Sequence, residues 1–144
     1  MITREVDYAL RIMLGLTVNG RQKEWFCAQD LAREMHVPYR FLRKIVCRLA
    51  TANLITTRRG KKGGIKLNCP PKTTSMADVL RVMDSSTLTL NQCLMRNNTC
   101  VRKGHCVVHE ELKPIQKMLH KQLSRVTLAR LASKQLKQAK AQAV

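Results

Sequence analysis

Two short segments with helical hydrophobic periodicity meet at a proline, and this junction constrains the fold more than any other feature. Apolar side chains repeat at helical spacing in residues 29–35, and again from Leu42 to Leu49. Pro38 lies between the two segments and suits the first position of a helix, because it lacks an N–H and has a fixed φ. The junction therefore predicts two helices joined by a tight turn, as in a helix-turn-helix.

A basic, glycine-punctuated turn follows the second of these helices. Residues 54–58 and 64–67 are rich in β-branched side chains, and residues 59–63 between them contain two glycines. This pattern predicts a two-stranded hairpin with a basic tip, here called the wing. Two further helices are expected, over residues 3–18 and 76–83. Together these elements predict a mainly α fold, a winged helix-turn-helix over residues 1–84.

The charge of the chain favours a polyanionic partner. The chain carries 27 Lys and Arg against 9 Asp and Glu, a net charge of +18. Residues 35–77 hold ten basic residues and no acidic one, so nothing within this run offsets the repulsion. Aromatic residues make up only 3%, which disfavours RNA and single-stranded partners that are bound by stacking. Double-stranded DNA is the expected partner.

The outward face of the second helix and the wing provide the expected DNA contacts. We expect Arg40 and Arg43 to read base edges in the major groove, because arginine can donate two hydrogen bonds to guanine. Arg59 at the tip of the wing suits a narrow minor groove, where the negative potential is concentrated. An alternative is that these residues only solvate a surface helix. The other expected contacts are Tyr39, Lys44, Arg48, Arg58, Lys61 and Lys62.

Three of the six cysteines fall within fourteen residues, in a segment without periodicity. His109 follows Cys93, Cys100 and Cys106 in a C-x2-H pair with the last of them. Thiolates together with an imidazole suit zinc or an iron–sulfur cluster, and the spacing leaves both open. The isolated cysteines are expected to be small buried hydrophobes, and two histidines to be structural or solvated. These residues are Cys27, Cys47 and Cys69, and His36 and His120.

A helical pattern with a repeat near 3.5 residues begins at about Glu110 and continues to Val126. Such a repeat is typical of a helix that packs on a partner helix, and two copies would read two half-sites of DNA. We therefore expect a homodimer. The second half of the chain is divided into a cysteine-rich loop, a dimerisation helix with a short terminal helix, and a flexible basic tail. Their ranges are 85–109, 110–132 and 133–144.

Other classes of protein are disfavoured. No stretch approaches 18 uninterrupted apolar residues, and the first seven residues carry charges where a signal peptide is apolar. A cytoplasmic protein without a membrane partner or a small-molecule substrate is expected. A thiol enzyme would need a base and an orienting carboxylate, and the loop offers His105 and His109 with only Glu110 and Glu111 nearby. We therefore expect no enzyme.

The chain resembles a family of bacterial iron–sulfur winged-helix regulators that includes IscR and NsrR, over nearly its whole length. The segments TREVDYALR, VPYRFLRKI and NLITTRRG, with GGIKL after the last, resemble the N-terminal helix, the recognition helix and the wing of that family. They span residues 3–11, 37–45, 53–60 and 63–67. The three-cysteine loop resembles the sensor segment of the family. The resemblance implies a DNA-binding transcriptional regulator, a repressor, that responds to cluster status, oxygen or nitric oxide.

The resemblance also implies a cofactor and its ligands. An iron–sulfur cluster would be held by Cys93, Cys100, Cys106 and one further ligand, with a 2Fe–2S cluster slightly preferred over a 4Fe–4S cluster. In IscR-like members the further ligand is a histidine, which His109 matches. In some NsrR-like members it is an aspartate of the partner subunit, which Asp7 matches. The alternative is a winged-helix protein with a structural zinc site and no sensing role.

Overall fold

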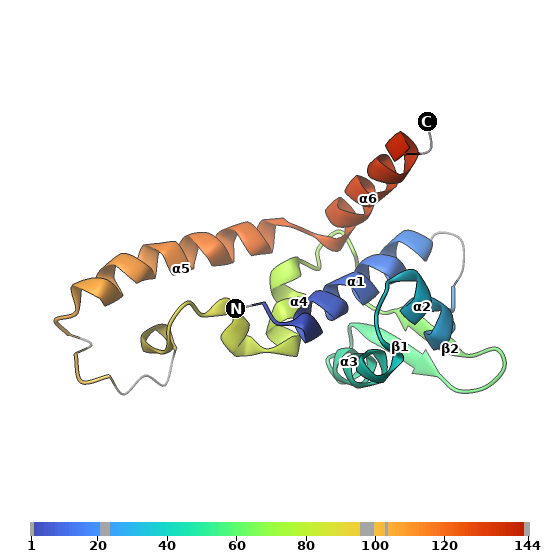
Figure 1. The fold of residues 1–144 in the computed structure, drawn as a ribbon, viewed down its shortest axis with the longest axis horizontal. Coiled ribbons are helices and arrows are strands. Elements are labelled where there is room, and N and C mark those ends of the chain that lie inside the picture. The colour runs from blue at the N-terminus through green and yellow to red at the C-terminus, as the bar shows by residue number, and fades with distance from the viewer. Residues whose placement is uncertain (1, 21–23, 96–99, 103, 143–144) are drawn as a thin grey trace.

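The fold was obtained as a computed structural model, which describes residues 2–20, 24–95, 100–102 and 104–142. This part contains six α-helices, two 3-10 helices and one two-stranded antiparallel sheet (Figure 1). The order along the chain is α1 (Arg4–Asn19), α2 (Ala28–Glu34), α3 (Tyr39–Thr51), β1 (Ile55–Arg58), β2 (Gly64–Leu67), α4 (Met76–Met83), η1 (Ser85–Leu88), η2 (Gln92–Leu94), α5 (Val107–Arg125) and α6 (Leu128–Gln142). The predicted mainly α, winged helix-turn-helix fold is confirmed.

The core forms around α1, which contacts α2, α3, α4 and α6. Its broad apolar face buries Ile12 completely, in one core cluster with Ile45 of α3, Leu80 of α4 and Leu128 of α6. The helix predicted for residues 3–18 is therefore present as α1 and packs its apolar face inward. Because α3 lies directly on this core, its position depends on α1 and α4.

The turn between α2 and α3 lies where Pro38 predicts it. The N–H of Val37 donates a hydrogen bond to the carbonyl of Ala32 at 2.9 Å, and α3 begins at Tyr39. His36 has a φ of +52°, in the left-handed region. This backbone conformation does not continue a right-handed helix, so α2 ends before it. The helix predicted for residues 29–35 therefore ends one residue earlier than expected, at Glu34.

The wing pairs Ile55 with Leu67, and the four-residue register runs to Arg58 and Gly64. Phe26 forms an isolated antiparallel bridge with Ile65 of β2. The N–H of Phe26 donates to the Ile65 carbonyl at 2.9 Å, and the Phe26 carbonyl accepts from the N–H of Ile65 at 2.8 Å. Gly64 has a φ of +140°, and a Cβ there would lie 2.3 Å from the Phe26 carbonyl oxygen. Only glycine fits so close an approach of two strands.

Ser75 caps the start of α4 through a capping box. Its hydroxyl accepts from the N–H of Asp78 at 3.3 Å, and the Asp78 carboxylate accepts from the N–H of Ser75 at 2.8 Å. Burial acts to raise the pKa of Asp78, but hydrogen bonds from Ser75 and Arg81 outweigh it and leave this pKa lowered. The charged form of Asp78 therefore holds the start of α4.

The second half of the chain differs from its predicted boundaries. Helix α5 begins at Val107, so that His109 lies in its first turn and not in the loop. The segment after Asp84, expected to be irregular, contains the 3-10 helices η1 and η2. Among the described residues, no helix combines the length and hydropathy that a membrane span needs.

Residues 133–142, expected to belong to a flexible tail, continue helix α6 instead. The helix is anchored at its start, because Leu128 and Ala132 are buried and the Leu128 N–H bonds the Thr74 carbonyl at 2.9 Å. The Lys, Gln and Ala residues that follow are strong helix formers and extend the anchored helix. Residues 143–144 of the predicted tail lie outside the described part.

Candidate nucleic-acid interface and cysteine segment

The outward face of α3 carries the residues predicted to contact DNA. Leu42, Ile45 and Leu49 are buried, and on the opposite side Arg40 and Arg43 are exposed. The Arg40 guanidinium lies 4.9 Å from the centre of the neighbouring Phe41 ring. Within the described residues Arg43 makes no hydrogen bond or ion pair. The two side chains predicted to read bases are thus presented to solvent, as is Tyr39.

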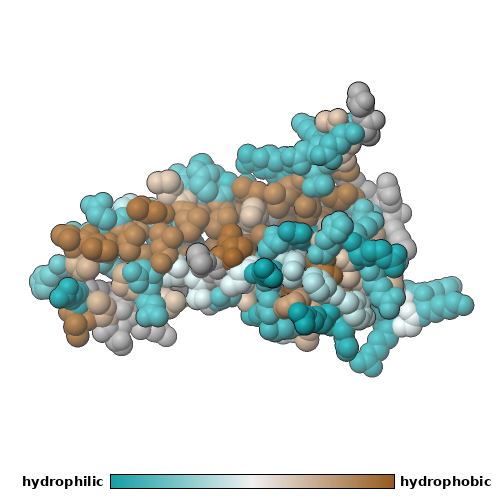
Figure 2. Space-filling model, in the orientation of Figure 1, coloured by the Kyte–Doolittle hydropathy of each residue, from teal (hydrophilic) through white to brown (hydrophobic). Residues whose placement is uncertain are grey.

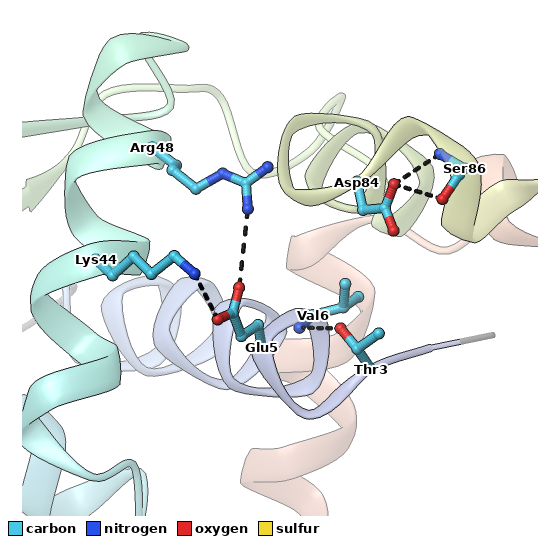
Figure 3. A network of polar contacts seen from close by, with 7 residues as sticks. All are labelled: Thr3, Glu5, Val6, Lys44, Arg48, Asp84 and Ser86. Atoms are coloured by element: carbon cyan, nitrogen blue, oxygen red, sulfur yellow. Dashed lines mark hydrogen bonds and ion pairs between the residues drawn. The ribbon is translucent and has the colours of Figure 1, made fainter.

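Two other cations of α3 are paired with a carboxylate of α1 (Figure 3). Lys44 Nζ lies 2.8 Å from Glu5 Oε1, and Arg48 Nη1 lies 3.8 Å from Glu5 Oε2. Glu5 is in the first turn of α1, where the helix dipole favours a negative charge. Sequence reasoning missed this contact because 39 residues separate Lys44 from Glu5.

Arg58, the last residue of β1, stabilises the turn of the wing. Its guanidinium donates a hydrogen bond to the Lys62 carbonyl and lies 4.5 Å from the centre of the Trp25 ring. Arg58 at the end of β1 thus bonds across the turn, whereas Arg59 and Lys61 are exposed at the tip without such a bond among the described residues, together with the side chain of Lys62. The structure therefore presents three cations at the wing tip and uses the fourth to hold that tip in place.

The structure does not bring the three clustered cysteines together. Cys93 lies in η2, Cys100 is exposed, and Cys106 directly precedes α5. Among the described residues, no group of three or more His, Cys, Asp or Glu side chains is close enough to hold a metal ion. Val101, between the second and third cysteines, is 98% exposed, so this apolar side chain does not anchor the loop. Residues 96–99 and 103 of the predicted loop lie outside the described part.

Cys93 and His109 line one pocket of about 300 Å³. The Nδ1 atom of His109 is buried and has no hydrogen-bond partner in the described part of the chain. A buried polar atom without a partner is costly and often marks the place of a ligand. A thiol and an available imidazole nitrogen in one pocket fit the donor set of a metal cluster. Asp7, the other predicted ligand, forms an exposed ion pair with Arg11 at 2.9 Å.

The segment that leads to Cys93 is tied to the middle of α5. The Leu88 carbonyl accepts a hydrogen bond from Gln116 and lies 3.0 Å from His120 Nε2. The Gln116 side-chain oxygen accepts from the N–H of Leu90 at 2.7 Å. A structural role for His120 is thus confirmed, while the contacts of Gln116 were missed because no local pattern marks them. These bonds link the approach to the cysteines with the middle of α5.

The isolated cysteines divide into two kinds. Burial raises the pKa of the Cys69 thiol, and Cys69 is partly buried beside the core, close to the expected environment. The expectation of burial is wrong for Cys27 and Cys47, which are both exposed. Cys47 lies on the outward face of α3, and Cys27 precedes α2 in extended backbone, so neither position faces the core.

An apolar face of α5 is left uncovered. The helix has no buried residue, and it packs mainly on α4 and the two 3-10 helices. Val108, Ile115 and Met118 are among its exposed side chains, and Figure 2 shows a hydrophobic band along this helix. Ile115 and Met118 belong to the predicted pattern with a repeat near 3.5 residues. Leu112 and Leu119 of the same pattern are partly buried.

Comparisons with known proteins agree with this geometry. The family model Rrf2, described as iron-dependent transcriptional regulator, matches residues 2–134. The HTH-type transcriptional regulator NsrR of Shouchella clausii is 30% identical over 116 residues, which cover 77% of this chain and 76% of the relative. The HTH-type transcriptional repressor NsrR of Streptomyces coelicolor is 24% identical over 132 residues, or 92% of this chain and 88% of the relative.

Two solved structures share the fold. IscR of T. potens superposes with a TM-score of 0.74 at 18% identity, over 93% of this chain and 87% of that chain. CymR, the global cysteine regulator of B. subtilis, superposes with a TM-score of 0.75 at 22% identity, over 93% of this chain and 97% of that chain. The similarity extends beyond the wing and α4 to the second half of the chain.

Proposed function

The chain belongs to the Rrf2 family of iron-dependent transcriptional regulators, and from this premise we propose that it is a repressor whose DNA binding is switched by an iron–sulfur cluster. Cys93, Cys100, Cys106 and His109 would hold the cluster. The observation that carries this proposal is the buried Nδ1 atom of His109, without a hydrogen-bond partner among the described residues, in the pocket that Cys93 also lines.

The fold alone does not select the signal, because the similar structures include both IscR and a global cysteine regulator. The choice rests on the donor set. Three thiols and an imidazole in the segment between η2 and the first turn of α5 suit iron and sulfide. A 2Fe–2S cluster is the form we propose.

The mechanism depends on how the cysteine segment is connected to α3. When bound, the cluster would supply a redox-active group that oxygen or nitric oxide can alter. The chain must then bring Cys100 and Cys106 to the pocket of Cys93 and His109, so ligand binding is coupled to local folding. Leu88 belongs to the same core cluster as Ile45 of α3. A shift of the cysteine segment would therefore act on the recognition helix, as in a two-state switch.

Anaerobic purification separates this proposal from a structural zinc site. The absorption and Mössbauer spectra of the anaerobic protein, with its iron, sulfide and zinc contents, provide the measurement. We expect iron and sulfide in equal amounts and the spectra of a 2Fe–2S cluster. A colourless protein with one zinc per chain, unable to accept iron and sulfide, would support the zinc alternative and contradict the sensor.

The proposed DNA contacts of α3 and of the wing should affect DNA affinity in different ways. Arg43→Ala should weaken operator binding by about 1–3 kcal/mol and relax the preference for one base pair, because it removes a bidentate contact. Lys62→Ala should weaken binding to all duplexes alike and lower the salt slope by about one unit, because it removes a phosphate contact. Fluorescence anisotropy on operator and scrambled duplexes measures both. Equal, sequence-independent losses would place α3 outside the major groove.

We also propose that two copies of the chain pair along the apolar face of α5. Met118→Glu would then bury a charge in both halves of a symmetric seam and weaken the dimer by about 3 kcal/mol, or about a hundredfold. Ser124→Glu adds the same charge at an exposed position of α5 on the opposite face and is the control. Sedimentation velocity gives the masses. A wild-type monomer, or equal dimer affinities for both variants, would contradict this interface.

A further inference from the structure

The basic face of α3 is partly neutralised by a residue from another helix. The Glu5 side chain is 28% exposed and reaches Lys44 and Arg48, while residues 35–77 contain no acidic residue of their own. Glu5 and Arg48 also line a depression of about 480 Å³ with Met83 and Asp84, at the end of α4. The carboxylate thus sits at the junction of α1, α3 and α4 (Figure 3).

The arrangement is held by the core. Val6 and Ala9, in the turn that follows Glu5, are fully buried, so α1 is fixed against α3. Lys44 and Arg48 are four residues apart on one helix face, where two like charges repel each other. Glu5 offsets that repulsion. Exposed ion pairs add little to stability, so the main consequence of this one concerns the charge that α3 presents to a partner.

The cations of α3 fall into two groups. Arg40 and Arg43 carry their charge towards solvent without a carboxylate partner among the described residues. Lys44 and Arg48 share one carboxylate, and a phosphate that bound either of them would compete with Glu5 and be repelled by it. Fewer counterions are then released when DNA binds, and both the affinity and its salt dependence are lower than the charge of α3 alone would give.

We propose that Glu5 limits the sequence-independent affinity of this protein for duplex DNA by occupying Lys44 and Arg48. This inference rests on the DNA-binding function proposed above and adds an acidic residue that regulates the affinity for DNA. It also revises the expectation that Lys44 and Arg48 are ordinary phosphate contacts. Base recognition by Arg40 and Arg43 does not depend on Glu5.

The test is the full-length variant Glu5→Gln, measured by fluorescence anisotropy on a random-sequence duplex and on a selected operator over a range of salt concentrations. We expect both duplexes to be bound about three- to tenfold more tightly at about 0.1 M salt, with a salt slope steeper by about one unit. Asp30→Asn is the control, since it makes the same change in net charge and, among the described residues, Asp30 forms an ion pair only with Arg33 of its own helix, at 3.8 Å. Equal effects of the two variants would overturn the proposal.

A double-mutant cycle with Lys44 makes the test independent of net charge. Lys44→Ala should weaken DNA binding at least about threefold more in the Glu5→Gln background than in the wild type, because only there is Lys44 released to phosphate. Equal losses in both backgrounds would show that Glu5 does not restrain Lys44. If none of the proteins bound any duplex, the DNA-binding function itself would fail, a result distinct from unchanged binding.

Discussion

Replacing Cys106 with alanine is expected to remove nearly all bound iron and sulfide from the anaerobically purified protein. The operator affinity of the variant should then be the same with and without iron and sulfide in the loading mixture. The physical reason is that a cluster needs four donors, and the loss of one thiolate leaves a loop that has little apolar surface with which to order itself. Iron and sulfide analysis together with the absorption spectrum provides the measurement.

Cys27→Ala is the matched control, because Cys27 is also exposed but lies outside the proposed ligand set. It should retain iron and sulfide at the wild-type level. In the same assay His109→Ala should lose the cluster, whereas Asp7→Ala should keep it, if His109 is the fourth ligand. Full iron and sulfide occupancy in Cys106→Ala would contradict the ligand assignment.

Leu88→Ala is expected to lower the free energy of unfolding by about 2–5 kcal/mol, the largest stability effect that we predict for the segment before the cysteines. Leu88 is 2% exposed, and its side chain packs in the same cluster as Leu80 and Ile45. The alanine leaves a cavity in the contact between η1, α4 and α3. Urea denaturation of the cluster-free protein, followed by circular dichroism, measures the change.

Leu90→Ala provides the comparison, since Leu90 is two residues away and 45% exposed. Its loss should cost less than about 1 kcal/mol, because less apolar surface is removed from contact. Equal costs for the two variants would mean that η1 is not part of the core. The proposed route from the cysteine segment to the recognition helix would then lack its first contact.

The elements of the winged helix-turn-helix were predictable because local chemistry specifies each of them. Pro38 marks the start of α3, and the glycines of the wing allow its turn. These signals act within a few residues of the chain, where spacing and side-chain type suffice. The winged helix-turn-helix therefore followed from patterns without knowledge of tertiary contacts.

The contacts that connect these elements were not predictable in the same way. Glu5 meets Lys44 across 39 residues, and Gln116 meets Leu88 across 28. No local pattern identifies such partners. The extent of α6 was underestimated for a related reason, because its helix depends on the burial of Leu128 and Ala132 against the rest of the fold.

The cysteine segment shows a different limit of prediction from sequence. Its sequence indicates a metal-binding chemistry, yet the described residues bring only Cys93 and His109 into one pocket. A loop dominated by polar and basic side chains gains little from folding by itself, so its closed form depends on the ligand. Sequence chemistry therefore suggested the donors that we propose, and the structure adds that Cys93 and His109 line the same pocket.

In the function proposed above, cluster occupancy controls how the dimer holds its operator. The most direct measurement is the dissociation constant of one anaerobic preparation for a selected operator, taken before and after the cluster is removed by nitric oxide or a chelator. We expect the two values to differ by about 5–150-fold, the usual range of coupling between two sites. Indistinguishable affinity and base preference in the two states would contradict it.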